Sequence, residues 1–361
     1  MSWPSWLPLR GNLHPLSPYG APQVPAQASL NTNENPYSPS PALQKAITDA
    51  VAKVAAGLNR YPDRDATVLR TNLASYINEL SGTKFSADNI WAANGSNEII
   101  QSIFLAFAGG PVLGFTPSYS MHPLIAKVTD AQWIDGTRNA DFSLNISTAI
   151  VEIKKNKPPL TFMETPNNPT GGAVTIDEIQ MLADACKSVG GLLVVDEAYA
   201  EFSQEISAAT LIANNPHVLV IRTMSKAFAF AGARVGYLVS DAAVKDAMMI
   251  VRLPYHLSAL TQAAAQVAID HRAELLGGVA TIIAARESVV QALRDMGLTT
   301  IPSSANFVLF TGFKQESPQL WAAMLEKGVL IRDVGLSGYL RVTIGNEAEN
   351  ALFISALKEL I

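Results

Sequence analysis

The sequence predicts an α/β protein whose mostly parallel sheet is covered by helices on both faces, followed by a smaller α+β domain. Three observations support this prediction. Short apolar strands alternate with helical patterns from about residue 41 to 250, and strands separated by helices form parallel sheets. After residue 250 the alternation gives way to two helices and then strands. Prolines crowd the first 29 residues and favour an extended arm. We therefore expect an arm (1–40), a large domain (41–250) and a small C-terminal domain (251–361).

The individual elements follow from apolar runs and helix-start signals. In the large domain we expect strands at Ile90–Ala93, Val112–Phe115, Leu160–Glu164, Leu192–Asp196, Val218–Thr223 and Val235–Val239. Helices are expected at Ile99–Phe107 and Ile176–Val189, the latter opened by a capping box of Thr175 and Glu178. In the small domain we expect helices at Ser258–Asp270, Ala273–Met296 and Pro318–Lys327, a final helix, and strands at Asn306–Thr311, Val329–Asp333 and Leu340–Ile344.

The proline-rich arm has two interpretations. Trp3, Trp6 and Leu7 indicate that it packs on something, such as a second subunit. A partly disordered tail fits the composition equally well.

Composition and charge exclude several classes of protein. The chain of 361 residues is 48% hydrophobic and 16% charged, as in a compact globular protein. A net charge of −5 argues against a nucleic-acid-binding protein, which usually carries a basic face. Any bound anion must therefore meet local cations, and the candidates are Arg234, Arg332 and Arg341.

Known motifs for other chemistry are missing. The single cysteine, Cys186, excludes an intramolecular disulfide and a cysteine-based metal cluster, and its helical setting predicts a buried apolar residue. The sequence contains no H-E-x-x-H pair, phosphate-binding G-x-x-x-x-G-K-[ST] or strand-linked G-x-G-x-x-G, so we expect no metal. It shows no secretory signal and no membrane-length apolar run. We therefore expect a cytoplasmic protein.

One lysine carries the strongest chemical signal. Lys226 directly follows an apolar strand, close to Thr223 and Ser225, and Arg234 lies eight residues further on. A lysine in an apolar site tends to lose its charge, and a neutral amine can condense with an aldehyde. A hydroxyl and an arginine suit a phosphate dianion. The combination points to pyridoxal phosphate; the alternative is a surface lysine at a strand-to-helix junction.

Asp196 strengthens that interpretation. It ends the apolar run of Leu192–Asp196, at the edge where open α/β sheets bind ligands. Opposite a pyridine nitrogen, its carboxylate would keep that nitrogen protonated, which is how proteins tune this cofactor. The alternative role for Asp196 is a helix N-cap.

Eight sequence blocks extend these two signals along nearly the whole chain. They are Leu30–Tyr37, Asn59–Pro62, Trp91–Glu98, Thr165–Gly171, Asp196–Phe202, Arg222–Arg234, Arg252–His256 and Leu340–Gly345. With them the chain resembles the fold-type-I, pyridoxal-phosphate-dependent aminotransferases, and within these the histidinol-phosphate aminotransferases of actinobacterial type. The resemblance implies a homodimer and a large domain with a mostly parallel seven-stranded sheet.

The resemblance also implies how the cofactor is held. Gly95, Ser96 and Asn97 open a helix, where free N–H groups can cradle a phosphate; alone they would indicate an ordinary helix start. The phosphate partners implied with them are Thr223, Ser225, Arg234 and, from the partner subunit, Tyr61. Tyr119 would stack on the pyridine ring, and Asn168 and Tyr199 would donate hydrogen bonds to the phenolate oxygen.

Two arginines are the implied substrate anchors. Arg341 would bind the α-carboxylate, although a lone arginine on a strand usually faces solvent. Arg332 would meet the far anion, either the phosphate of histidinol phosphate or the side-chain carboxylate of glutamate. The remaining implied contacts are Tyr19, Asn97, Tyr255 and His256.

The predicted reaction moves an amino group from L-glutamate to imidazole-acetol phosphate, giving L-histidinol phosphate and 2-oxoglutarate, in two half-reactions at Lys226. An aromatic-amino-acid aminotransferase is the nearest alternative, and Arg332 with Tyr19 favours the phosphorylated substrate. A threonine-phosphate decarboxylase has similar motifs. A non-catalytic regulator would need an added N-terminal DNA-binding domain, for which the arm leaves no room.

Overall fold

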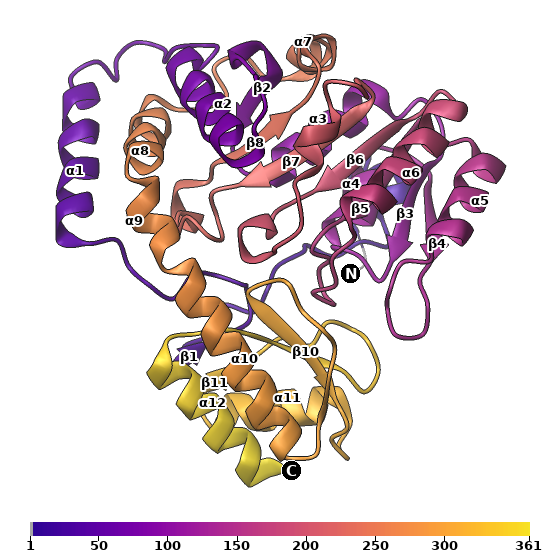
Figure 1. Cartoon of the computed structure of the whole chain (residues 1–361), viewed down its shortest axis with the longest axis vertical. Coiled ribbons are helices and arrows are strands. Elements are labelled where there is room, and N and C mark those ends of the chain that lie inside the picture. Colours follow the sequence, from indigo (N-terminus) through magenta and orange to yellow (C-terminus); the bar gives the residue numbers. More distant parts are fainter. Residues whose placement is uncertain (1–2) are drawn as a thin grey trace.

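The computed structural model describes residues 3–361, which form two units of different size (Figure 1). The larger unit holds a seven-stranded sheet, and the smaller holds a three-stranded antiparallel sheet covered by helices. The helices α8 (Ala259–Asp270), α9 (Arg272–Gly277) and α10 (Val279–Asp295) run in succession from the larger unit into the smaller. Within the described residues no helix is long and apolar enough to cross a membrane.

The large sheet confirms the fold class. Its strand order is β2 (Ile90–Ala93), β8 (Gly236–Val239), β7 (Val218–Thr223), β6 (Leu192–Asp196), β5 (Leu160–Glu164), β3 (Val112–Thr116) and β4 (Trp133–Thr137). One strand, β8, pairs antiparallel with β2 and β7, and the other pairs in this sheet are parallel. All the strands expected in the large domain are present. The sequence did not predict β4, because Asp135 and Gly136 interrupt its apolar run.

Helices cover both faces of this sheet. On one face α3 (Ser96–Phe107), α4 (Met121–Val128) and α7 (Ala242–Val251) pack in one apolar cluster. On the other face lie α2 (Thr67–Ser81), α5 (Ile146–Asn156), α6 (Ile176–Ser188) and α8, and α1 (Pro41–Ala55) packs against α8. Strand residues alternate between the clusters: Leu193 and Val195 face one, and Val194 faces the other. This alternation is the period of two that a strand imposes.

The smaller unit includes the end of the arm. Its antiparallel sheet has the order β12 (Leu340–Thr343), β10 (Phe307–Thr311), β9 (Thr299–Thr300). The arm's β1 (Ala28–Ser29) pairs in parallel with β11 (Val329–Leu330). The core lies between these strands and α10, α11 (Ser317–Glu326) and α12 (Glu347–Leu360). Short 3-10 helices occur at Gly11–Leu13, Ala87–Asn89, Ala200–Phe202, Ala208–Leu211 and Ala231–Ala233.

Some expected boundaries differ from the structure. The helix expected at Ala273–Met296 is divided at Gly277 and Gly278 into α9 and α10, because two consecutive glycines weaken a helix. The strand expected at Val329–Asp333 is reduced to two residues and an isolated bridge between Arg332 and Arg341. Since α8 packs in the core of the large sheet, we propose that the smaller unit begins near α10 rather than at residue 251.

The arm bonds to its own chain near α4. Arg10 Nη2 donates to the carbonyl of Val128 at 2.6 Å, and Asn12 Nδ2 donates to Asp130 Oδ1 at 3.0 Å. Trp6 nevertheless remains 77% exposed. Between these anchors and β1 the arm reaches the space between the two units, where Tyr19 and Ala21 line the cavity described below.

A buried ion network supports the sheet away from that cavity. Arg222 on β7 contacts Glu197 Oε2 through Nε and Glu201 Oε1 through Nη1, both at 2.9 Å. All three side chains are at most 6% exposed. A buried carboxylate without a cationic partner lowers the free energy of unfolding. The stability of this network therefore depends on Arg222, its one cation.

Replacing Arg222 with Met should therefore destabilise the protein by about 3–5 kcal/mol. The measurement is the urea-unfolding midpoint of the two proteins. Lys45→Met is the matched control, since the Lys45–Asp49 pair is exposed and its loss should cost less than about 1 kcal/mol. Equal midpoints for Arg222→Met and the control would contradict the role given to the network.

Candidate active site

A cavity of about 360 Å³ lies between the two units, a volume typical of small-molecule sites. Its walls come from the carboxyl ends of β5, β6 and β7, the start of α3, the arm, and residues 332–334 and 341. The predicted site residues that line it are Tyr19, Ser96, Asn97, Tyr119, Asn168, Asp196, Tyr199, Thr223, Ser225, Lys226, Arg234, Arg332 and Arg341. Parallel strands bring their ends to one edge, which is why residues far apart in sequence meet here.

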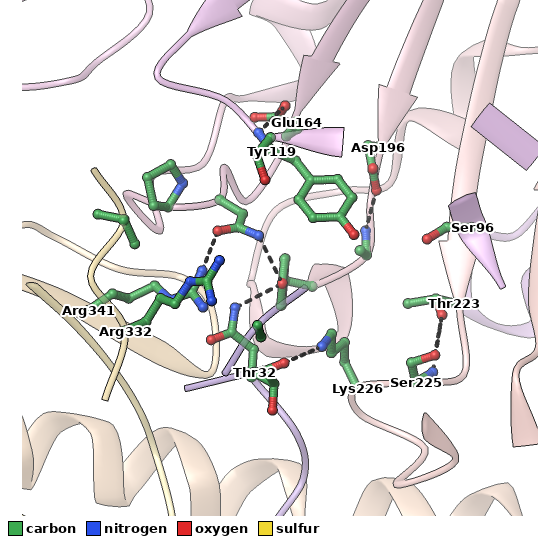
Figure 2. Close-up of a pocket in the computed structure, with 18 of the residues that line it drawn as sticks. Thr32, Ser96, Tyr119, Glu164, Asp196, Thr223, Ser225, Lys226, Arg332 and Arg341 are labelled. Carbon is green, nitrogen blue, oxygen red and sulfur yellow. Dashed lines mark hydrogen bonds between the residues drawn. The ribbon is translucent and has the colours of Figure 1, made fainter. Parts of the chain in front are cut away.

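Lys226 occupies the middle of this cavity, with Thr223 and Ser225 on one side and the two arginines on the other (Figure 2). Its Nζ donates to the carbonyl of Thr32 at 2.7 Å and lies 5.9 Å from the centre of the Tyr199 ring. Burial, with the nearby charges of Arg341 and Arg234, lowers the pKa of Lys226 to about 7. The amine is thus available in its neutral, nucleophilic form near neutral pH.

A phosphate cradle lies beside Lys226. Gly95 has φ of 82°, and a Cβ on it would come 2.4 Å from Arg234 Nη2, so only glycine fits there. Arg234 Nη1 donates to Ser225 Oγ at 3.4 Å, and Thr223 Oγ1 donates to the same oxygen at 3.0 Å. These hydroxyls, the guanidinium and the start of α3 together form the donor set that a phosphate dianion requires.

Asp196 ends β6 at the floor of the cavity. Its Oδ1 accepts a hydrogen bond from the backbone N–H of Ala198 at 3.1 Å, and its Oδ2 lies 3.3 Å from Nε2 of His122. The other ring nitrogen of His122 lies 2.9 Å from Glu164. The sequence analysis missed His122, whose helix α4 it did not detect. Glu164 carried a usable signal, because it ends an expected strand next to the one ended by Asp196.

Tyr199 retains a proton to donate. Its hydroxyl accepts hydrogen bonds from Asn33 Nδ2 at 2.9 Å and Asn168 Nδ2 at 3.4 Å. Burial raises the pKa of Tyr199 to about 12, although Arg341 and Asn33 act in the opposite direction, so the phenol keeps its O–H. Asn33 has no role in the sequence analysis; it stands in a left-handed conformation with φ of 57°.

Tyr119 is also held firmly. Its backbone N–H donates to Glu164 Oε1 at 3.0 Å, and its hydroxyl donates to Asn97 Oδ1 at 3.2 Å. The ring lines the cavity next to Asp196. An aromatic wall of this kind suits a planar ring bound against Asp196.

The two arginines form the cationic end of the cavity. Arg341 Nη2 donates to the carbonyl of Asn31 at 2.8 Å and Nη1 donates to Asn168 Oδ1 at 2.5 Å. Burial lowers the pKa of Arg341 to about 10, so the group stays charged at neutral pH. Its backbone pairs with that of Arg332, which brings both guanidiniums to one wall (Figure 2).

Tyr61, Tyr255 and His256 lie outside this cavity. The Tyr61 and Tyr255 rings stack with centroids 4.4 Å apart and are 79% and 40% exposed. His256 Nε2 lies 2.9 Å from the carbonyl of Ala92. Tyr255 and His256 therefore do not line the cavity of their own chain, and their expected contacts with substrate stay predictions.

Comparisons with known proteins identify the family of the chain. The family model for class I and II aminotransferases matches residues 25–357. The chain belongs to this family. It is 53% identical to the histidinol-phosphate aminotransferase of Mycolicibacterium vanbaalenii over 97% of this chain and 95% of that protein, and 51% identical to that of Mycobacterium marinum over 97% and 91%.

Solved structures show the same fold. The histidinol-phosphate aminotransferase of Sinorhizobium meliloti, in complex with pyridoxal 5'-phosphate, has a TM-score of 0.82 and 25% identity over 93% of this chain and 91% of that one. A Thermus thermophilus aspartate aminotransferase mutant has a TM-score of 0.84 and 19% identity, covering 98% of this chain and 99% of that one. The fold-type-I architecture expected from the sequence is confirmed.

The cofactor of this aminotransferase is pyridoxal 5'-phosphate, and the residues present fit it. Glycine at position 95 leaves room beside Arg234 for the phosphate, and Tyr199 has an O–H to donate. Asp196 faces the cavity with a negative charge for the ring nitrogen. Within residues 3–361 no group of three or more His, Cys, Asp or Glu side chains is arranged to hold a metal.

The lowered pKa of Lys226 predicts selective chemistry in the cofactor-free protein. Reductive methylation of Lys226 should rise with pH through a midpoint near 7, whereas lysines in water titrate near about 10.4. Peptide mapping by mass spectrometry at a series of pH values measures the midpoint. Arg341→Met should move it upward, because a neighbouring cation is removed. A Lys226 midpoint above about 9, near the value in water, would contradict the burial argument.

Proposed function

We propose that this chain is a histidinol-phosphate aminotransferase that exchanges an amino group between L-glutamate and imidazole-acetol phosphate. The observation that carries the proposal is the identity of about half over nearly the full length of curated enzymes of that name. The paired guanidiniums of Arg332 and Arg341 support it, because glutamate carries two carboxylates and histidinol phosphate carries a phosphate dianion. The cytoplasmic location expected from the sequence stays a prediction.

Lys226 performs the proton chemistry. When bound, pyridoxal phosphate supplies an electron sink that stabilises negative charge on the substrate Cα. The neutral amine of Lys226 is the group that would hold the cofactor's aldehyde between turnovers. With substrate bound, Lys226 Nζ would take the proton from the substrate Cα. Its lowered pKa matches this work, since a general base is most effective with a pKa near the working pH.

Residues around Lys226 hold the reacting groups in place. The cradle of Gly95, Ser96, Thr223, Ser225 and Arg234 fixes the phosphate. Tyr199 and Asn168 would bind the phenolic oxygen, Tyr119 would cover the ring, and Asp196 would face the ring nitrogen. Such positioning contributes to rate because it removes the entropy of bringing the groups together.

The substrate is oriented by its two ends. Arg341, whose side chain is buried and held by Asn31 and Asn168, binds the α-carboxylate of glutamate. Arg332 takes the far anion, which is a phosphate in one half-reaction and a carboxylate in the other. Tyr19 is 47% exposed at the mouth of the cavity, where it meets the imidazole end.

The enzyme acts as a homodimer. Tyr61 and Tyr255 are exposed and stacked, and Leu58, Ile250 and Leu253 near them in sequence are 50%, 84% and 73% exposed. Apolar side chains exposed together are typical of an interface. In the dimer, Tyr61 of the partner subunit completes the phosphate cradle.

Replacing Arg332 with Met tests the substrate assignment. We expect KM for histidinol phosphate to rise roughly 10- to 100-fold, the loss typical of a charge-assisted contact. Turnover of phenylalanine, which carries no far anion, should change little. Steady-state rates on both substrates measure this, with the exposed Arg294→Met as control. An equal loss on both substrates, or a native preference for phenylalanine, would favour an aromatic aminotransferase.

Mixed dimers test the shared site. Lys226→Ala should be inactive, and Tyr61→Ala should bind cofactor weakly. Mixing the two after partial unfolding and refolding should restore activity, because a hybrid dimer has one site with both native residues. Activity no higher than that of Tyr61→Ala refolded alone would exclude a role for Tyr61 across the interface.

A further inference from the structure

A buried histidine lies between two buried acids below the cofactor cavity. His122 on α4 has Nδ1 2.9 Å from Glu164 Oε1 and Nε2 3.3 Å from Asp196 Oδ2. These are ion-pair distances, although neither contact is straight enough for a full hydrogen bond. His122 is 0% exposed, and Glu164 and Asp196 are 4% exposed each. The proton chemistry proposed for Lys226 uses neither His122 nor Glu164.

The arrangement requires a particular protonation of His122. A neutral imidazole carries one N–H, so its other nitrogen would turn a lone pair toward a carboxylate. With both ring nitrogens next to acids, only the doubly protonated cation faces attraction on both sides. Burial alone would lower the pKa of His122, but Asp196 and Glu164 outweigh it and raise the pKa to about 9.

Glu164 is fixed by more than His122. Its Oε1 also accepts the backbone N–H of Tyr119 at 3.0 Å, and its Oε2 accepts a hydrogen bond from Asn167 Nδ2. Glu164 and Asp196 are direct partners on the parallel strands β5 and β6. The two acids therefore end at one level, a side chain's width apart, and His122 fills the space between them.

The other groups packed around His122 add no charge that would change its protonation. The rings of Phe162, Tyr119 and Trp133 lie 5.0, 5.6 and 6.3 Å from the imidazole. Burial raises the pKa of Tyr119 well above its usual value, so this phenol stays neutral. Arg138 is attracted by Glu164, but its side chain bonds to the carbonyls of Phe115 and Phe142 rather than to the acid.

We propose that Glu164 is a positioning residue that keeps His122 cationic, so that Asp196 presents one orientation and one charge to the cofactor ring throughout the working pH range. Glu164 and His122 cancel each other's charge, which leaves the single negative charge of Asp196. Without Glu164, a neutral His122 can satisfy Asp196 through Nε2–H alone. The imidazole then titrates near neutral pH, and the charge around Asp196 changes with it. The inference rests on the proposed function only in placing the ring nitrogen at Asp196.

The first test uses the native, cofactor-free protein. Nitrogen-15 NMR of the imidazole distinguishes the cation from each neutral tautomer, and the chain has only five histidines. The signal of His122 is assigned by its loss in His122→Asn. We expect both ring nitrogens to remain protonated from pH 6 to 8, with a midpoint near 9. A neutral His122 at pH 7 would overturn the proposal and leave the aminotransferase function untouched.

The second test replaces Glu164 with Gln, which has nearly the same shape. Removing one of two flanking charges should lower the His122 midpoint by about one pH unit or more. The absorption spectrum of the cofactor-loaded variant should gain a pH transition at the same midpoint, which a purely structural role would not produce. Glu326→Gln, which removes a charge at the exposed end of α11, is the control. It should leave the His122 midpoint and the absorption spectrum unchanged. An unshifted His122 midpoint in a folded Glu164→Gln protein would reject the role of Glu164.

Discussion

The Lys226 amine lies where a positive charge is disfavoured, and the rest of the site is arranged around that constraint. Burial between the two units and the nearby cations of Arg341 and Arg234 lower its pKa to about 7. The carbonyl of Thr32 holds the neutral nitrogen in place. Because Thr32 belongs to the arm and Arg341 to the small unit, the reactivity of a residue on the large sheet depends on all three parts of the chain.

Charge is distributed along the cavity in a fixed order. Arg332 and Arg341 stand at one end, Arg234 and the start of α3 at another, and Asp196 with His122 and Glu164 beneath the expected ring position. In the proposed binding mode each anionic group of cofactor or substrate would meet a cation, and the ring nitrogen would meet an acid. In a buried site such complementary charges act strongly because little water screens them. With this order of charges, a protein with a net charge of −5 offers local cations to a phosphate dianion.

The sequence predicted much of the site because its strongest signals are local. Lys226 and Asp196 each end an apolar run, and Gly95 precedes a helix, so neighbouring residues already indicate what they do. The predictions were weaker where contacts with distant segments determine the bounds of an element or the role of a residue. The apolar periodicity predicted one helix across Gly277 and Gly278, where the structure has two. Strand β4 carries too few apolar residues to be recognised. His122, Glu164 and Asn33 were missed because their partners lie on other elements.

The sequence by itself determined the fold class, the cofactor and the residues at the strand ends, because hydrophobic period and local motif are properties of short segments. Only the tertiary structure decided which side chains share a cavity, since that depends on strand order and on the packing of the small unit. It placed His122 between two acids, gave Asn33 a contact with Tyr199, and moved Tyr255 to an exposed stack with Tyr61. Desolvation and Coulomb interactions act between groups close in space, and closeness in space is what a linear pattern does not contain.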